Sequence, residues 1–288
     1  MKTAFLPLAF LSATLSQGFG AMIVNDTFAD GDRTNGADAL DVSWFKGTTA
    51  ATLAVANDTT FGSNAMRYSP GGSLAATVAA MPSTTLAVGE TIRISVTFRY
   101  ESGAPTNSPG AFRMGLFTNN GGETLGDTAT VAADGSAHTA DGYYASFPSG
   151  PADAPTTSGN GYEIFRETED NNAILAGNRS SLGAPTVTTA GMSGTGAYTA
   201  LFEITRGASS TTFRSYLDAG TGTPTSQVGA GTDSSVAQIS TFDTIALSIG
   251  GNNTAWLIDG VTVEVIPEPS AALLGLLGGL SLLGVRRR

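Results

Sequence analysis

The amino-acid sequence predicts an all-β fold built as a sandwich of two antiparallel sheets. Apolar residues alternate with polar ones in well-separated segments, as they do in half-buried strands. Glycine occurs 37 times among 288 residues and only 13% of residues are charged, a composition that favours turns and strands over solvent-facing helices. Apart from the two terminal segments, no stretch of 12 or more residues shows a sustained helical stripe.

Three segments carry the clearest alternation. Residues 91–100 place five apolar side chains on one face and hydroxyls with two arginines on the other; the apolar set is Ile92, Ile94, Val96, Phe98 and Tyr100. Residues 198–204 repeat this pattern. Residues 254–265 form a last strand whose apolar spacing slips by one at Asp259-Gly260, which predicts a β-bulge.

Weaker patterns predict ten further strands. They cover residues 23–28, 42–46, 51–56, 65–69, 74–79, 111–117, 143–147, 161–166, 211–217 and 242–249. Turn-rich connections are expected at 102–110, 119–122, 149–161 and 220–235. About a dozen strands in one domain, residues 21–264, predict two packed antiparallel sheets.

The first 20 residues read as a secretory signal peptide. Lys2 supplies the positive start, residues 4–15 are apolar, and Gly18 and Gly20 are the small residues before a cleavage site. Cleavage after Gly18 or Ala21 is an alternative. The sequence therefore predicts export.

The last 24 residues, 265–288, have a different organisation. The run 271–285 is uncharged and would form a helix of about 22 Å, short of the roughly 30 Å hydrocarbon core of a bilayer. Pro267 and Pro269 prevent its extension backwards, and three arginines, Arg286, Arg287 and Arg288, mark a cytoplasmic end. This order predicts a short transmembrane helix, serving either as a plain anchor or as a processed signal.

This tail resembles the PEP-CTERM sorting domain of bacterial surface proteins. In that family a Pro-Glu-Pro triplet, here Pro267-Glu268-Pro269, precedes a short apolar helix and a terminal arginine cluster. The resemblance implies an exosortase-type membrane peptidase as a partner. It also implies transient or permanent attachment to the inner membrane, followed by release to the cell surface or the exopolysaccharide matrix.

Composition narrows the chemistry of the body. The chain has no cysteine and a single histidine, His138, so thiolate chemistry and histidine-rich zinc sites are excluded. Residues 21–266 hold 10 basic and 23 acidic residues, a net charge of −13. Since phosphate binding needs a basic surface, no nucleic-acid partner is expected. Calcium or a neutral polysaccharide remains compatible.

The body also resembles the concanavalin A-like (laminin G-like) jelly-roll sandwich. The resemblance rests on Asp26-Thr-Phe-Ala-Asp-Gly-Asp32, Ser43-Trp-Phe45, Phe112-Arg-Met-Gly-Leu-Phe117 and Trp256-Leu-Ile-Asp-Gly-Val261. It implies a fold used for carbohydrate binding, sometimes for glycan cleavage, and often with a structural calcium ion.

Three aspartates form the candidate metal site. Asp30 and Asp32 flank a glycine, and Asp259 joins them if the first and last strands are neighbours. Carboxylate oxygens are ligands for Ca²⁺, which takes six to eight of them. The alternative is an Asx-type turn with solvated carboxylates.

Glu163 and Glu167 lie in the most acidic stretch, with Glu169 and Asp170 following. Retaining glycosidases need two carboxyl groups about 5–5.5 Å apart and inverting ones about 6.5–9.5 Å. Residues four apart on a strand are separated by about 13 Å. Laminarinases of the concanavalin A-like fold carry acids at alternating positions, and position 165 is Phe. We therefore expect a strand end running into a solvated acidic loop.

Other candidates are given structural roles. Arg93, Arg99 and Arg113 are expected to form surface ion pairs with acids such as Glu163 or Glu203; the alternative is that they line a concave face. The aromatic residues that could stack on sugars are expected in the core; they are Trp44, Tyr143, Tyr144, Tyr162 and Trp256. His138 lies in a polar loop without a nucleophile elbow, so no catalytic triad is expected.

These observations predict a non-catalytic surface or matrix protein that binds extracellular polysaccharide. Two alternatives remain: a secreted glycan-cleaving enzyme of concanavalin A-like fold, and a purely structural coat component.

Overall fold

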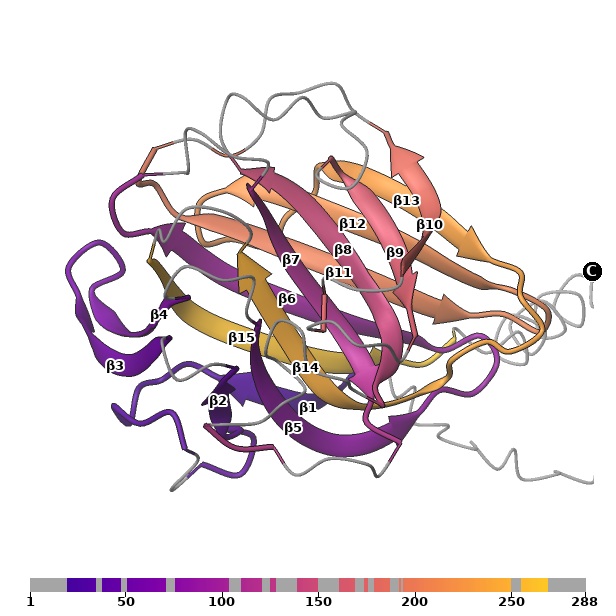
Figure 1. The fold of residues 1–288 in the computed structure, drawn as a ribbon, viewed down its shortest axis with the longest axis horizontal. Helices are drawn as coiled ribbons and strands as arrows, with labels where there is room; N and C mark the ends of the chain where they lie inside the picture. The colour runs from indigo at the N-terminus through magenta and orange to yellow at the C-terminus, as the bar shows by residue number, and fades with distance from the viewer. Residues whose placement is uncertain are drawn as a thin grey trace, which may run out of the picture.

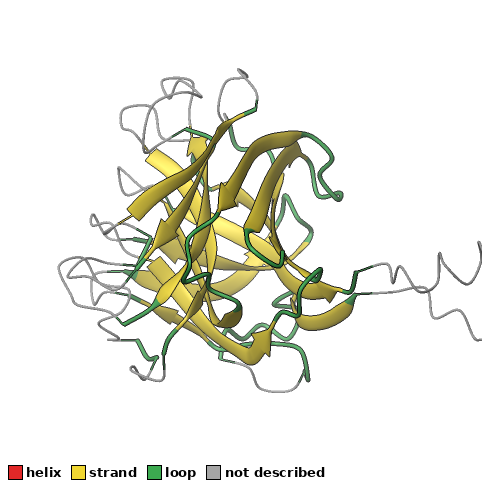
Figure 2. Cartoon of the chain, turned by 90° about the vertical axis from the view of Figure 1, so that its right-hand side faces the viewer, coloured by secondary structure: helices red, strands yellow, loops and turns green. Residues whose placement is uncertain are grey.

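The structure is a computed structural model that describes residues 20–34, 38–47, 51–70, 76–103, 110–120, 125–127, 139–149, 161–168, 174–175, 179–186, 192, 194–249 and 255–268. Within these ranges the chain forms fifteen β-strands and no helix (Figures 1 and 2). The strands are β1 (Ala21–Asp26), β2 (Trp44–Lys46), β3 (Thr52–Asp58), β4 (Ser63–Ser69), β5 (Ala76–Thr85), β6 (Thr91–Tyr100), β7 (Gly110–Thr118), β8 (Asp141–Ser149), β9 (Glu163–Glu167), β10 (Arg179–Pro185), β11 (Tyr198–Arg206), β12 (Thr211–Ala219), β13 (Gln227–Asp233), β14 (Thr241–Ile249) and β15 (Trp256–Ile266).

The strands pack as two antiparallel layers (Figure 1). One layer has the order β2-β5-β14-β7-β8-β9, and the other has the order β13-β12-β11-β6-β15-β4-β3, with β1 also on β15. Strand β10 pairs with both β9 and β13 and thus joins the layers along one side. The predicted all-β antiparallel sandwich is confirmed.

All thirteen predicted strand regions coincide with strands of the structure, and two strands were not predicted. β10 (RSSLGAP) and β13 (QVGAGTD) contain few large apolar residues, so they show no alternation to read. The prediction of residues 220–235 as a turn-rich connection was wrong where β13 lies. These two strands are stabilised by pairing with each other and with β9 and β12.

The predicted bulge and the pairing of first and last strands are both confirmed. The register of β15 against β6 shifts between Ile258 and Gly260. β1 runs antiparallel to β15, with Ala21 opposite Val265. The described chain therefore starts and finishes at one end of the body, which we call the terminus end. β14 begins at this end, because Ser240 accepts a hydrogen bond from Leu86 in the β5–β6 turn.

The core between the layers is built around aromatic rings. Phe98, Phe112 and Trp256 pack together, with centroid distances of 4.2 Å for Phe98–Phe112 and 5.2 Å for Phe112–Trp256. All three are fully buried. Burying one such side chain is worth about 1.5–3 kcal/mol, so this cluster fixes the relative position of the layers.

The predicted export segments lie outside the described residues. These are residues 1–19 of the predicted signal peptide (1–20) and the tail from Pro269 onward, with its predicted helix 271–285 and Arg286, Arg287 and Arg288. Over the described ranges, no helix is long and apolar enough to cross a membrane. Pro267 and Glu268 are described: the Glu268 carboxylate lies over Gly89, where an added Cβ would come within 2.2 Å of its Oε2.

Candidate functional site

The candidate site lies on the outer face of the layer β14-β7-β8-β9, which we call the covered face. Strand alternation and register place four polar side chains in one line across these strands. Glu163 is opposite Ser146, Ser146 is opposite Arg113, and Arg113 is opposite Ser248. We call this line the polar row. It lies towards the far end of β14 from the terminus end, because Ser248 is next to the last residue of that strand.

Apolar side chains occupy the middle of the covered face. The rings of Tyr144 and Phe165 stack with centroids 5.0 Å apart, and the Arg179 guanidinium lies 4.9 Å from the Phe165 centroid. Gly115 leaves room for the Tyr144 side chain, since an added Cβ would lie 2.6 Å from that of Tyr144. Leu175 completes the cluster and is fully buried. The covered face thus carries a second, smaller core.

Glu167 and Arg113 hold the backbone of Leu175 against this cluster. The Leu175 amide donates to Glu167 Oε1 at 2.8 Å, and Arg113 Nη1 donates to the Leu175 carbonyl at 2.5 Å. Glu167 is fully buried and Arg113 is 5% exposed. Burial lowers the pKa of Arg113 and raises the pKa of Tyr144 to about 12. The side chains of Glu167 and Arg113 therefore have a structural role, because both hold the backbone of Leu175 in place.

Two sequence expectations on this face are corrected. Arg113 was expected in a surface ion pair, and it is buried and bound to a backbone carbonyl. Glu167 was expected in a solvated strand end, and it is fully buried. Strand alternation could not reveal this burial, because the segment that covers these residues lies eight residues after Glu167 and 62 after Arg113.

The two acids of β9 have different surroundings. Glu163 and Glu167 share the covered face, but Phe165 lies between them and packs on Tyr144. Glu167 accepts the Leu175 amide. Glu169, Asp170 and His138 lie outside the described residues. Glu163 is the partly exposed member of the polar row.

Ser146 has the most enclosed hydroxyl of the polar row. It is fully buried, and among the described residues its Oγ has no hydrogen-bond partner. A buried hydroxyl usually finds a partner, because leaving it without one costs about 1–3 kcal/mol. Ser146 is therefore a polar group with hydrogen-bonding capacity left over, directly beside Glu163.

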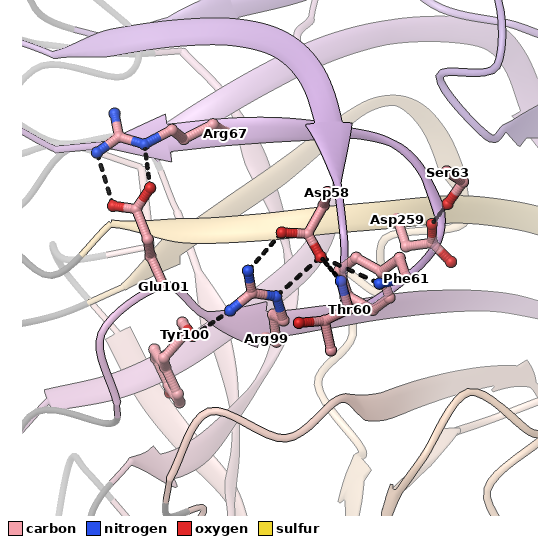
Figure 3. Close-up of polar contacts among 9 residues, drawn as sticks. All are labelled: Asp58, Thr60, Phe61, Ser63, Arg67, Arg99, Tyr100, Glu101 and Asp259. Atoms are coloured by element: carbon pink, nitrogen blue, oxygen red, sulfur yellow. Dashed lines mark hydrogen bonds and ion pairs between the residues drawn. The ribbon is translucent and has the colours of Figure 1, made fainter.

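The arginines of β6 lie on the outer face of the other layer, which we call the open face. Arg93 binds Glu203 at 2.6 Å on β11 and Glu264 at 3.1 Å on β15. Of the two expected partners, Glu203 is confirmed for Arg93. The expectation of a surface ion pair was wrong for Arg99, which pairs with Asp58 and is largely buried (Figure 3). This pairing lowers the pKa of Asp58 below its usual value.

The candidate calcium ligands make hydrogen bonds within the protein. Asp30 Oδ1 accepts the amide of Asp32, and Asp32 Oδ1 accepts the amide of Thr34, as in Asx turns. Asp259 accepts the Ser63 hydroxyl at 2.5 Å (Figure 3). Across the described ranges, no three acidic or histidine side chains are grouped so as to hold a metal ion. Calcium binding by Asp30, Asp32 and Asp259 stays a prediction.

Asp26 is a buried acid that sequence reasoning placed only in an opening motif. Its Oδ2 accepts the Trp44 indole N–H at 2.8 Å and its Oδ1 accepts the Phe28 amide at 3.1 Å. Burial raises its pKa to about 6. The Asp26 carboxyl group therefore links β1 to β2, and its burial makes the ionised form of the group unfavourable.

Nearby, a surface pocket of about 350 Å³ is lined by Ile23, Ala39, Asp41, Val42, Ser43, Ala80, Met81 and Pro82. Its carboxyl group, Asp41, has a pKa raised by partial burial and by the neighbouring charges of Asp38 and Asp30. Sequence reasoning did not find this pocket, because its lining comes from three separate segments.

The five aromatic residues considered as sugar-stacking candidates are all in the core, as predicted. Trp44, Tyr143, Tyr144, Tyr162 and Trp256 are at most 2% exposed. In the described part of the chain, the exposed large apolar side chains are Met22, Leu40, Val88 and Val236, none of them aromatic.

Comparison with known proteins gives a likeness of fold. The chain matches no protein-family model and no curated protein. Among solved structures it is similar to the globular domain of T. cruzi calreticulin, with TM-score 0.46, 9% identity, and 91% of this chain and 95% of that chain covered.

Two further similar structures are the Emp46p carbohydrate recognition domain and an endo-1,3-β-glucanase from Streptomyces sioyaensis. The first has TM-score 0.42 and 11% identity, covering 75% of this chain and 88% of that chain. The second has TM-score 0.36 and 10% identity, covering 92% of this chain and all of that chain. At these values the likeness concerns the β-sandwich fold alone.

Proposed function

We propose that this protein is an exported, non-catalytic surface protein whose body binds neutral extracellular polysaccharide at the polar row. The observation that supports binding over cleavage is that the two glutamates of β9, Glu163 and Glu167, have different surroundings. Glu163, the partly exposed member of the polar row, lies directly opposite Ser146, whose buried hydroxyl has no hydrogen-bond partner among the described residues. Carboxylates and hydroxyls are groups that hydrogen-bond sugar hydroxyls. Glu167, which a glycosidase would need as its second carboxyl group, holds the Leu175 amide instead.

Sorting by the C-terminal tail is part of the same proposal. The Pro267-Glu268-Pro269 triplet, the apolar run and the arginine cluster favour recognition by an exosortase-type membrane peptidase at the inner membrane. The mass of the mature protein from cells tests this. A C-terminus near residues 267–270 supports processing, whereas retention of Arg288 makes the tail an anchor.

Binding is tested by passing the purified protein over columns of neutral polysaccharides, in the presence of calcium and of a chelator. We expect retention that weakens at least several-fold in Glu163→Gln. Glu264→Gln is the matched control, because Glu264 is a partly buried glutamate on the open face. No retention on any column would reject binding and leave the structural coat role.

The enzyme alternative makes a different prediction for the same variant. Release of reducing ends from a glycan panel by the native protein, abolished in Glu163→Gln but not in Glu264→Gln, would establish glycan cleavage. We expect no release by either protein, because Phe165 occupies the position of the intervening acid.

A further inference from the structure

The outer edge of β3 differs from the other strand edges of the sandwich. β3 is the last strand of its layer, and within the described residues it pairs only with β4. A strand edge presents backbone N–H and C=O groups that can pair with another chain. Proteins usually protect such edges with charge, proline, short length or a covering loop.

Two other edges show this protection. β2, which ends the opposite layer, has three residues and finishes at Lys46. The free side of β1 is crossed by a loop, because the Asn25 amide donates to the Leu40 carbonyl at 2.9 Å. Both edges are therefore poor templates for a further strand.

Within the part of the chain that the structure describes, β3 has none of these features along Thr52 to Asn57. This stretch, TLAVAN, contains no charge, no proline and no glycine. The side chains of Thr52, Ala54 and Ala56 are exposed, while Leu53 and Val55 are partly buried and pack against the core. Asp58, the one charged residue of the strand, is held by Arg99. Six uncharged residues, four of them apolar, thus line an edge in the described structure.

A second copy of the chain fits this edge better than an unrelated partner. In an antiparallel pair related by a two-fold axis, residues 52–57 face the same uncharged stretch, so no like charges oppose each other. The small side chains of Ala54 and Ala56 allow the two strands to approach. The remainder of the body carries the net charge of −13 and would repel another copy at most other surfaces.

We propose that β3 pairs with β3 of a second copy, forming a symmetric dimer in which one sheet continues across both bodies. The pairing would extend the layer β13-β12-β11-β6-β15-β4-β3 and would not involve the other layer, which carries Glu163. A dimer of a polysaccharide-binding body would present two polar rows, but the pairing itself does not depend on the proposed function.

Sedimentation of the purified full chain in detergent, at about 1–100 µM, tests the proposal. We expect a concentration-dependent dimer. The double variant Ala54→Glu/Ala56→Glu places acids opposite each other across the two-fold axis, and we expect dimerisation to weaken by about tenfold or more. Ala54 is opposite Arg67 in β4, so the variant retains a favourable neighbour within the monomer.

Thr212→Glu is the matched control, since Thr212 is exposed on β12 and has a strand on each side. It should dimerise like the native protein. Hydrogen exchange gives a second measurement: amides of residues 52–57 should exchange more slowly at high concentration in the native protein and not in the double variant. A native monomer at all concentrations, or a dimer unchanged by the double variant, would overturn the proposal.

Discussion

The outer faces of the two layers use the same residue types in opposite ways. On the open face, Arg93 lies between Glu203 and Glu264, and all three side chains are partly exposed. On the covered face, Arg113 and Glu167 are buried and bind the backbone of Leu175. The comparison shows that burial, and not residue type, decides what an arginine or glutamate does on a sheet. An exposed one forms an ion pair at the surface, and a buried one holds another segment against the sheet.

The energetic consequence follows from desolvation. Exposed ion pairs contribute about 0–1 kcal/mol, because water already solvates both partners well. Leaving a buried polar group without its partner costs about 1–3 kcal/mol, and leaving a buried charge without its partner costs about 3–5 kcal/mol, because the remaining group stays uncompensated in a low-dielectric environment. Equivalent substitutions on the two faces should therefore have unequal effects.

The largest expected effect is that of Glu167→Ala. The substitution leaves the Leu175 amide without its acceptor and removes negative charge near Arg113, so we expect a loss of about 3 kcal/mol or more in the free energy of unfolding. Urea denaturation measures it. Glu167→Gln retains an acceptor oxygen and should lose less than half as much. A loss below about 1 kcal/mol for Glu167→Ala would show that the covered face is not held in this way.

The next effect concerns Asp26, a buried acid bound to Trp44 without a cation. Its pKa is about 6 in the folded protein against an ordinary value of 3.8. The folded state therefore keeps this proton when the unfolded state has lost it, so stability falls as pH rises from about 4 to 6. The difference corresponds to about 3 kcal/mol at most.

Asp26→Asn provides the check on this pH dependence. The amide oxygen can still accept the Trp44 indole N–H, but it does not titrate. Unfolding measured at pH 4 and pH 7 should show a smaller loss of stability with rising pH in the variant than in the native protein. If stability depended on pH equally in the native protein and in Asp26→Asn, the titration of Asp26 would not be the cause of that dependence.

The smallest effect is expected on the open face. Arg93→Gln removes the link between Glu203 and Glu264 and should cost about 1 kcal/mol or less, decreasing further in high salt because the pair is screened. Urea denaturation at low and high salt measures this. A loss as large as that of Glu167→Ala would erase the distinction between the two faces.

The sandwich could be predicted because, in most strands, apolar and polar residues alternate within the strand's own sequence. Residues 91–100 read as a strand without any knowledge of their neighbours, and the slip at Asp259-Gly260 predicted the bulge. β10 and β13 could not be read, because their stability comes from pairing and not from their composition. For the same reason, the sequence could not show that Leu175 covers Arg113.

The candidate site was predicted only in part. Alternation on β9 placed Glu163, Phe165 and Glu167 on one face, and the missing central acid argued against cleavage. The neighbours Ser146 and Ser248 were not found, because cross-strand register is set by turns whose lengths do not reveal it. Single serines give no pattern to follow until the strands are aligned.

The pairing of Ala21 with Val265 has a consequence for how the molecule is displayed. A tether attached before Ala21 or after Ile266 would pull on neighbouring strand ends of the same edge of the body. Ser248, and with it the polar row, lies towards the opposite end of the strands. A protein fixed to a surface through either terminus therefore holds the end of the body that carries the polar row away from that surface.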